Sequence, residues 1–203
     1  MPFFQDRDTA VLYIHVPKTG GTSVEQYLSR RFRAPLGERT LYSGRRRGGS
    51  LQHQPLSRLE RDPRVAEAMR TAKNRVCFAT VRCPYDRAVS DLLWSGRITP
   101  GASRGQVETA LRRYLSETHE ATDYHNATQV SFVDAADTRA DIIKLEELGE
   151  GMRRLGFTDF DDRRKNMSLG RDTYREFLSA EARGIIEDAY GDDFEAFGYA
   201  RVE

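Results

Sequence analysis

The stretch from residue 10 to residue 32, AVLYIHVPKTGGTSVEQYLSRRF, constrains the fold more than any other part of the chain. It begins with AVLYIHV, a compact apolar run with β-branched side chains, which is typical of a buried strand. Apolar residues then recur at helical spacing over 21–32, at Val24, Tyr27, Leu28 and Phe32. The stretch therefore predicts a strand, a glycine-rich loop and a helix in direct succession.

The glycine-rich loop has the composition of an anion-binding site. Gly20 and Gly21 permit positive φ and a close approach of the backbone to a ligand. A helix that starts near Gly21 points free N–H groups and its positive dipole end into the same space. Further donors are the hydroxyls of Thr19, Thr22 and Ser23. These features favour a tetrahedral anion; the alternative is a plain strand-to-helix turn with Lys18 exposed.

Short apolar runs alternate with helical patterns along the rest of the sequence. Strands are predicted over 75–82 and at the start of 140–148, and helices over 62–74, 84–94, 103–118 and 179–199. This alternation predicts one α/β domain over 1–203, with a central parallel sheet flanked by helices and a P-loop-like loop after the first strand. Ligands of such sheets bind beyond the carboxyl ends of the strands, where the loops after Val16 and Val81 are expected.

Composition limits the classes of protein. The formal net charge of +1 argues against a nucleic-acid partner, and no apolar run approaches the ~20 residues of a membrane span. The N-terminus does not resemble a signal peptide, and the two cysteines, Cys77 and Cys83, are interpreted as reduced thiols of a cytoplasmic protein. The acidic stretch 185–197 is interpreted as a solvated helix. Arginines concentrate over 30–47, either as a solvated surface or as a basic rim for an anionic substrate.

The position of the lysine argues against a nucleoside triphosphate. In the triphosphate loop, GxxxxGK followed by Ser or Thr, the lysine follows the last glycine, whereas Lys18 precedes both glycines here. A triphosphate site also needs magnesium and a carboxylate at another strand end, but the second strand is followed by Arg82. A site with Lys18 and Arg82 can neutralise an anion without a metal ion, which suits the less highly charged sulfuryl group.

Four segments of the chain are IHVPKTGGTS, TVRCPYDRAVSDLLW, DIIKLEEL and EDAYGDDFEAFGY. Together they resemble segments of the sulfotransferases that use 3′-phosphoadenosine 5′-phosphosulfate (PAPS), and most closely those of the carbohydrate-type branch with the heparan sulfate 2-O-sulfotransferases. IHVPKTGGTS resembles the 5′-phosphosulfate loop, and TVRCPYDRAVSDLLW resembles the 3′-phosphate segment. DIIKLEEL and EDAYGDDFEAFGY are similar to the later strand and the C-terminal ending of the family. The four segments follow the family's order and together span nearly the whole chain.

The resemblance implies roles in binding the donor. Lys18 would contact the bridging oxygen of the phosphosulfate, while the loop from Gly20 to Ser23 holds the 5′-phosphate. Arg82 and Ser90 would hold the 3′-phosphate, although Cys83 replaces an acid that is frequent in the family pattern. A loop over 162–174 would close over the nucleotide, or would be a solvated basic loop; its candidate contacts are Arg164, Lys165 and Ser168.

The acceptor hydroxyl needs a general base, and histidine suits neutral pH. His53 in LQHQPLSRL resembles the family's histidine segment and is the first candidate, with His125 as the alternative. Asn126 and Gln129 are candidate acceptor contacts by the same resemblance. His15 is interpreted as structural and His119 as exposed, while Trp94 is expected in the core or in the wall of a pocket.

The function that the resemblance implies is metal-free sulfuryl transfer from PAPS to a hydroxyl of a saccharide or small metabolite. One alternative is a metal-dependent small-molecule kinase on a related phosphate-loop fold. Another is a non-catalytic relative that binds a nucleotide or a glycan. The sequence identifies neither the acceptor nor the oligomeric state.

Overall fold

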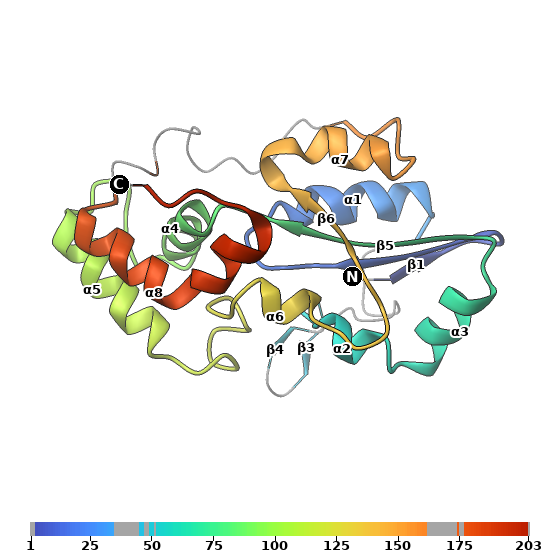
Figure 1. The fold of residues 1–203 in the computed structure, drawn as a ribbon, viewed down its shortest axis with the longest axis horizontal. Helices are drawn as coiled ribbons and strands as arrows, with labels where there is room; N and C mark the ends of the chain where they lie inside the picture. Colours follow the sequence, from blue (N-terminus) through green and yellow to red (C-terminus); the bar gives the residue numbers. More distant parts are fainter. Residues whose placement is uncertain are drawn as a thin grey trace.

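The computed structural model describes residues 3–34, 52–161, 174 and 177–202, and the backbone alone of 45–46 and 49–50. A four-stranded sheet in the order β1-β2-β5-β6 runs through the molecule (Figure 1). β2 (Thr9–Ile14), β5 (Asn74–Val81) and β6 (Asp141–Lys144) are parallel. β1 (Phe3–Gln5) pairs antiparallel with β2 at one edge. The predicted α/β fold is confirmed; the antiparallel strand, three residues long, is too short to give a periodic signal.

Helices cover both faces of the sheet (Figure 1). One face carries α1 (Gly21–Arg31) and α7 (Leu148–Arg154). The opposite face carries α2 (Leu56–Leu59), α3 (Pro63–Thr71) and α6 (Val130–Val133). A single turn, η1 (Leu145–Glu147), joins β6 to α7.

The alternating side chains of β2 contribute to two hydrophobic cores, one on each face of the sheet. Val11 and Tyr13 pack on the side of α1 and α7, whereas Leu12 and Ile14 pack on the side of α2 and α3. Successive side chains of a strand point to opposite faces, so a strand covered on both sides is apolar throughout. This burial explains why AVLYI reads as a continuous apolar run.

A third core lies beyond the carboxyl ends of the parallel strands. It packs α4 (Pro84–Trp94), α5 (Arg104–Leu115) and α8 (Ala180–Phe197) against one another (Figure 1). The acidic C-terminal stretch is a helix as predicted, but it is solvated on one face only, because Ile186, Tyr190 and Phe194 belong to this core and Asp193 is fully buried.

The longer predicted helices are confirmed to within a few residues, and their starts have recognisable caps. Asp62 accepts a hydrogen bond from the Arg64 N–H at the start of α3, and Ser103 and Gln106 form a capping box at the start of α5. The four-residue helices α2 and α6 and the pair β3 (Arg45–Arg46) and β4 (Gly49–Ser50) were not predicted. Segments this short carry no periodic signal.

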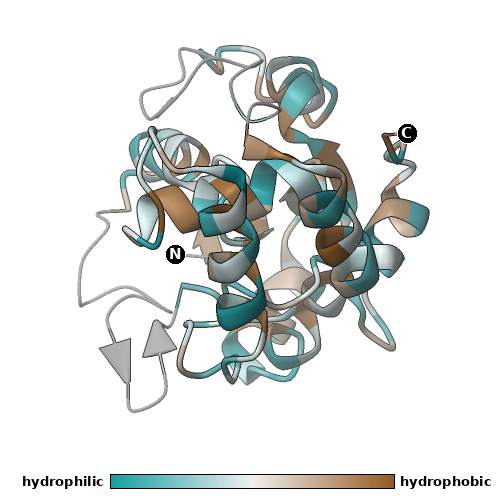
Figure 2. Cartoon of the chain, turned by 90° about the vertical axis from the view of Figure 1, so that its left-hand side faces the viewer, coloured by the Kyte–Doolittle hydropathy of each residue, from teal (hydrophilic) through white to brown (hydrophobic). Residues whose placement is uncertain are grey.

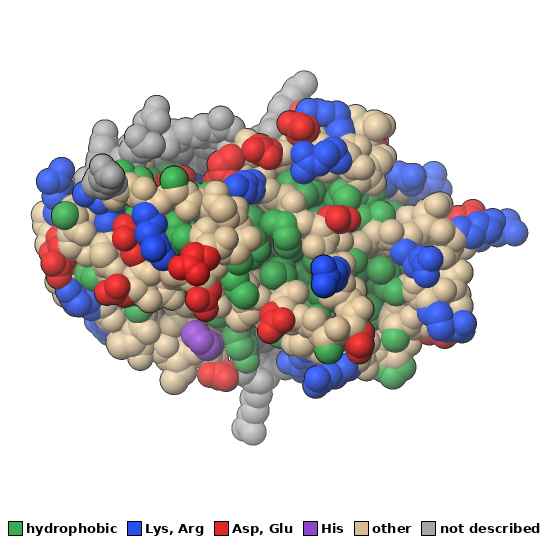
Figure 3. All heavy atoms as spheres, viewed as in Figure 1, with side chains coloured by type: hydrophobic (Ala, Val, Ile, Leu, Met, Phe, Trp, Pro, Cys, Tyr) green, Lys and Arg blue, Asp and Glu red, His purple; other side chains and the backbone are tan. Residues whose placement is uncertain are grey.

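The distribution of apolar and charged side chains agrees with a composition in which positive and negative residues are nearly equal in number. Hydrophobic segments gather toward the centre of the molecule (Figure 2), and positive and negative side chains are interspersed over the face drawn in Figure 3. Within the described ranges, no helix is both long and apolar enough to cross a membrane. Cys77 and Cys83 are free thiols, and burial raises the pKa of Cys83 to about 11.

Candidate functional site

The loop between β2 and α1 turns through left-handed backbone. Gly20 has φ 85° and forms the N-cap of α1, which starts at Gly21 as predicted. Lys18 has φ 66°, a conformation that costs a non-glycine residue free energy and is concentrated at functional sites. The N-cap contributes no side-chain hydrogen bond to the helix start, and N–H groups at a helix N-terminus suit an anion.

The two glycines are needed for different reasons. Gly20 requires its positive φ, and an added Cβ would also lie 2.6 Å from Leu145 Cδ1. Gly21 is helical, but an added Cβ would lie 2.0 Å from His15 Nε2. The expected positive φ therefore holds for Gly20 only, and Gly21 instead makes room for the imidazole of His15.

The three hydroxyl residues of the loop lie in different places. Thr19 is fully buried, donates to the Val16 carbonyl at 2.8 Å, and lies 2.8 Å from the Thr80 hydroxyl. Its side chain thus ties the loop to β5 and leaves only its backbone for a ligand. Thr22 is exposed and Ser23 is half-buried, so their hydroxyls remain accessible.

The second predicted loop meets the first at the carboxyl edge of the sheet. Arg82 follows β5, and its Nη1 lies 3.4 Å from the Lys18 carbonyl oxygen. The guanidinium carbon lies 4.9 Å from the ring centre of Tyr174. Parallel pairing of β2 with β5 brings these segments together although they are 64 residues apart. Ser90, the other predicted 3′-phosphate contact, is buried on α4.

Lys18 lies against an aromatic surface. Its Nζ is 4.8 Å from the ring centre of Trp94, and Trp94 stacks on His125 with ring centres 4.9 Å apart. Trp94 is 66% exposed, so it forms a wall of the site and not part of the core. Burial lowers the pKa of Lys18 to about 8; the charge of Asp91 opposes this shift, and Arg82 adds to it.

Three histidines form a row of contacting rings, which we call the histidine row: His15, His53 and His125. Ring centres are 5.0 Å apart between His15 and His53 and 4.9 Å apart between His53 and His125. Each Nδ1 faces a carboxylate, at 2.9 Å for His15 and Glu25, 3.2 Å for His53 and Asp123, and 2.6 Å for His125 and Asp91. Both predicted base candidates thus lie in one cluster, whose His125 end adjoins Trp94 and, through it, Lys18.

His15 matches its structural interpretation. It is buried beneath Gly21, and burial lowers its pKa although the Glu25 carboxylate opposes the shift. His119 is exposed as predicted and contacts Asn126 through Nδ1 at 2.8 Å.

Asn126 and Gln129 have internal partners, which does not fit the expected acceptor contacts. The Asn126 amide donates to the carbonyls of Tyr114 and Glu117, and its oxygen accepts from Thr122. Gln129 is fully buried; its oxygen accepts from the Arg82 N–H, and its nitrogen donates to the Arg82 carbonyl, both at 2.9 Å. We therefore regard Gln129 as a positioning residue for Arg82.

Arg87 and Asp193 are buried charged residues at the candidate site that the sequence reasoning missed. Arg87 is 2% exposed and donates to the carbonyls of Pro17, at the first loop, and of His125. Its Nη1 lies 4.0 Å from Asp193, which accepts the N–H groups of Gln129 and Val130 at the start of α6. Charged residues are rarely buried, so reasoning from the sequence pattern places them on the surface. One local sign of a buried charge was available: Arg87 and Asp91 are four residues apart on a mostly apolar helix, where oppositely charged side chains can pair.

The two later segments that resemble the family, DIIKLEEL and EDAYGDDFEAFGY, form hydrogen bonds at the carboxyl edge of the sheet. Glu146, in DIIKLEEL, accepts the Cys83 N–H at the start of α4 at 3.2 Å. Tyr199, near the C-terminus, donates to the other oxygen of Glu146 at 3.0 Å. Arg164, Lys165 and Ser168 lie outside the described residues, as do the side chains of 35–50 in the arginine-rich stretch.

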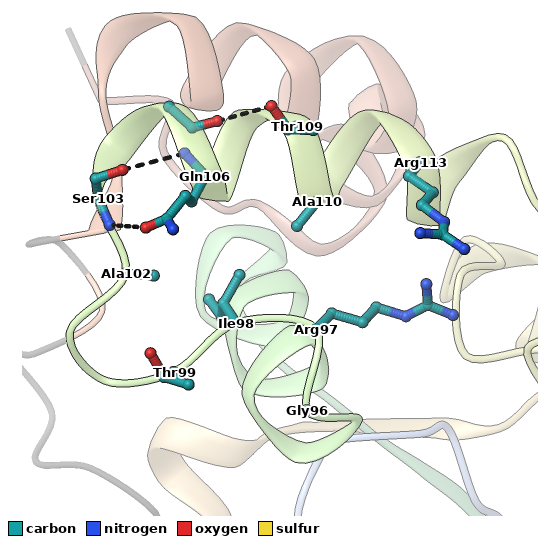
Figure 4. Close-up of a pocket in the computed structure, with 11 residues that line it drawn as sticks. Gly96, Arg97, Ile98, Thr99, Ala102, Ser103, Gln106, Thr109, Ala110 and Arg113 are labelled. Atoms are coloured by element: carbon teal, nitrogen blue, oxygen red, sulfur yellow. Dashed lines mark hydrogen bonds between the residues drawn. The ribbon is translucent and has the colours of Figure 1, made fainter.

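A pocket of about 690 Å³ lies beside the connection from α4 to α5 (Figure 4). Arg97 and Arg113 point their guanidinium groups toward each other at one side of it, and Glu117 pairs with Arg97 at 2.6 Å. No residue predicted for the site lines this pocket.

The model of the sulfotransferase family matches residues 1–141. The chain belongs to this family. Searches of curated proteins and of solved structures gave no significant match. The region that matches this sulfotransferase model contains the glycine-rich loop between β2 and α1, Arg82, Ser90 and the histidine row, whereas Asp193 and Tyr199 lie beyond it.

We predict that Arg87→Met destabilises this sulfotransferase by about 3–5 kcal/mol, because Asp193 would remain buried without its cationic neighbour. Arg112→Met is the matched control: Arg112 pairs with Glu181 at the surface and should contribute about 0–1 kcal/mol. The free energy of unfolding, measured in urea, distinguishes the two variants. Equal losses in both would contradict the central role of Arg87.

Proposed function

We propose that the protein transfers a sulfuryl group from PAPS to a hydroxyl group of an acceptor. The observation that carries the proposal is the contact between Arg82 and the Lys18 carbonyl, which brings two cationic side chains to one edge of the sheet. Both adjoin a loop whose backbone suits a tetrahedral anion. Family membership supports the reaction class.

The donor would lie along this edge. The loop from Gly20 to Ser23 would hold the 5′-phosphate, and Lys18 would stand at the oxygen that bridges phosphorus and sulfur. Arg82 and Ser90 would hold the 3′-phosphate, since a guanidinium group matches phosphate geometry. Arg164, Lys165 and Ser168 would add contacts to the nucleotide by resemblance to the family alone.

In the proposed reaction, the acceptor oxygen attacks sulfur while the bond from sulfur to the bridging oxygen breaks. The electron pair of that bond stays on the phosphate, leaving 3′-phosphoadenosine 5′-phosphate (PAP). The Lys18 ammonium group stabilises the charge that develops on the bridging oxygen. A lysine before the glycines suits this role, because it can flank the bond that breaks while the loop holds the phosphate that stays. Lys18 and Arg82 supply the positive charge, so the proposed reaction needs no metal ion.

A histidine of the histidine row would take the proton of the acceptor hydroxyl. The structure favours His125 over His53, because the buried Asp91 carboxylate accepts its Nδ1 hydrogen bond at 2.6 Å. Activated nucleophile systems in general use this arrangement, in which a third group orients the base through a hydrogen bond. His125 also adjoins Trp94 and, through it, Lys18. His53 remains the second candidate.

The exposed ring of Trp94 supports a saccharide as the acceptor class. An aromatic face beside the reacting groups offers apolar contact area, while polar neighbours fix orientation. A small metabolite with a ring of similar size would use the same surface. The free thiols Cys77 and Cys83 support a cytoplasmic location.

Ligand stabilisation tests the proposal against a kinase. At a concentration 100 times its dissociation constant, a ligand adds about 2.7 kcal/mol of stability, which raises the Tm of a chain of this size by several degrees. We expect PAP to give such a shift, ATP with magnesium to give little, and Lys18→Ala to weaken the PAP effect. The reverse ranking of the two ligands would refute the sulfotransferase proposal. PAP binding without transfer of labelled sulfate from PAPS to any of a panel of saccharides and alcohols would instead support the non-catalytic alternative.

Kinetics of two variants identify the base. If His125 takes the proton, His125→Ala should lower kcat by about 10²–10⁴ without weakening PAP binding. His119→Ala is the control, because His119 is the exposed histidine outside the histidine row. A loss of kcat confined to His53→Ala would assign the role to His53.

The pKa of Lys18 predicts how donor affinity depends on pH. Lys18 is charged below its pKa of about 8, so PAP affinity should fall as pH rises through that value. Binding can be followed by the fluorescence of Trp94, the single tryptophan, which lies beside Lys18. In Lys18→Arg the decline should disappear, because arginine stays charged. An unchanged decline in that variant would show that another group causes it.

A further inference from the structure

Part of the histidine row and a neighbouring aspartate form an arrangement that sulfuryl transfer does not need. His53, Asp123 and His125 each offer a ligand atom, and these atoms lie within 4.8 Å of one another. Two imidazoles and one carboxylate are a common ligand set for zinc, with a fourth position left open. We propose that this cluster binds a Zn²⁺ ion and that the bound ion inhibits the transferase.

The contact of His53 with Asp123 already has the spacing of two zinc ligands. His53 Nδ1 lies 3.2 Å from Asp123 Oδ2. Ligand atoms of a tetrahedral zinc site with bonds of 2.0–2.1 Å are ~3.3 Å apart. The His53 side chain is 9% exposed, and its Nδ1 makes no hydrogen bond within the described part of the chain. A buried polar atom without a hydrogen bond is costly, and coordination of a cation would remove that cost.

His125 is oriented as a metal ligand would be. Its Nδ1 pairs with Asp91 at 2.6 Å, which leaves Nε2 as the nitrogen available for coordination. A metal-binding histidine usually donates its other N–H to a carboxylate, which fixes the ring and increases its basicity. The Asp91–His125 pair therefore supplies the outer partner that zinc sites have.

Asp123 contributes a negative charge to the cluster and makes the cluster accessible from solvent. Asp123 and Tyr124 both have left-handed backbone, with φ 53° and 64°. The Asp123 side chain is 31% exposed, so an ion can reach the cluster from solvent. The carboxylate offsets part of the ion's charge, which makes binding beside two imidazoles favourable.

The predicted inhibition rests on the proposed function; the predicted binding does not. An ion on His53 and His125 would occupy the nitrogen lone pairs of both candidate bases, so neither could accept the acceptor's proton. The positive charge that the ion adds near Lys18 would not restore the rate, because the reaction still needs a base with a free lone pair.

Binding is tested on the full chain without a histidine tag, after treatment with a chelator. We expect calorimetry to show one Zn²⁺ per chain and Co²⁺ to give the visible absorption bands of a four-coordinate site. Asp123→Asn, His125→Ala and His53→Ala should each lower the Zn²⁺ affinity at least 10-fold, and Asp91→Asn should lower it by about 10–100-fold. Asp137→Asn and His119→Ala are controls, since both residues are exposed and lie outside the cluster.

The proposed site is refuted if the wild-type chain binds no Zn²⁺, or if the controls lose as much affinity as the cluster variants. Inhibition is then measured with PAPS and a working acceptor: the Zn²⁺ concentration for half-inhibition should rise at least 10-fold in Asp123→Asn, relative to that variant's own uninhibited rate. Zn²⁺ binding without inhibition would overturn the inhibitory role but leave the site intact. A chain that binds Zn²⁺ yet transfers no sulfate refutes the proposed function instead.

Discussion

The buried side chain of Arg87 holds the candidate site together. It donates to the carbonyls of Pro17 and His125, and it lies beside the buried carboxylate of Asp193. Burying a guanidinium group is costly unless its N–H groups are satisfied, so these partners fix one arrangement of the surrounding segments. Contacts with Arg87 therefore hold the first loop, the histidine row and α8 in one arrangement.

The edge proposed to bind the anion depends on a second constraint, the parallel pairing of β2 and β5. This pairing places Thr19 beside Thr80 and the Lys18 carbonyl beside Arg82. Gln129 then fixes the backbone of Arg82 with two hydrogen bonds. Asp193 holds the Gln129 N–H, which links this edge back to Arg87. The two positive side chains of the edge are thus positioned by buried polar contacts on several elements.

The sequence predicted most of the fold because its signals are local. The apolar run of β2, the helical spacing of α1 and the capping residues of α3 and α5 act within one element, so periodicity reveals them. It also named Lys18, Arg82 and two histidines, which the structure brings close together; their roles stay predictions. It did not predict the buried face of α8 or the internal hydrogen bonds of Asn126 and Gln129. Both depend on partners far away in the chain, and polar residues are assumed exposed when only neighbours are considered.

By itself, the sequence determined the order of strand, loop and helix, the early position of the lysine and the arginine after the second long strand. These are properties of consecutive residues and of backbone preferences. Only the tertiary structure decided that Gly21 yields space to His15, that Asp91 orients His125, and that His53, Asp123 and His125 form one cluster. The physical reason is that side-chain chemistry of this kind depends on distances of a few ångströms, and those distances exist only after the sheet and the three cores have packed.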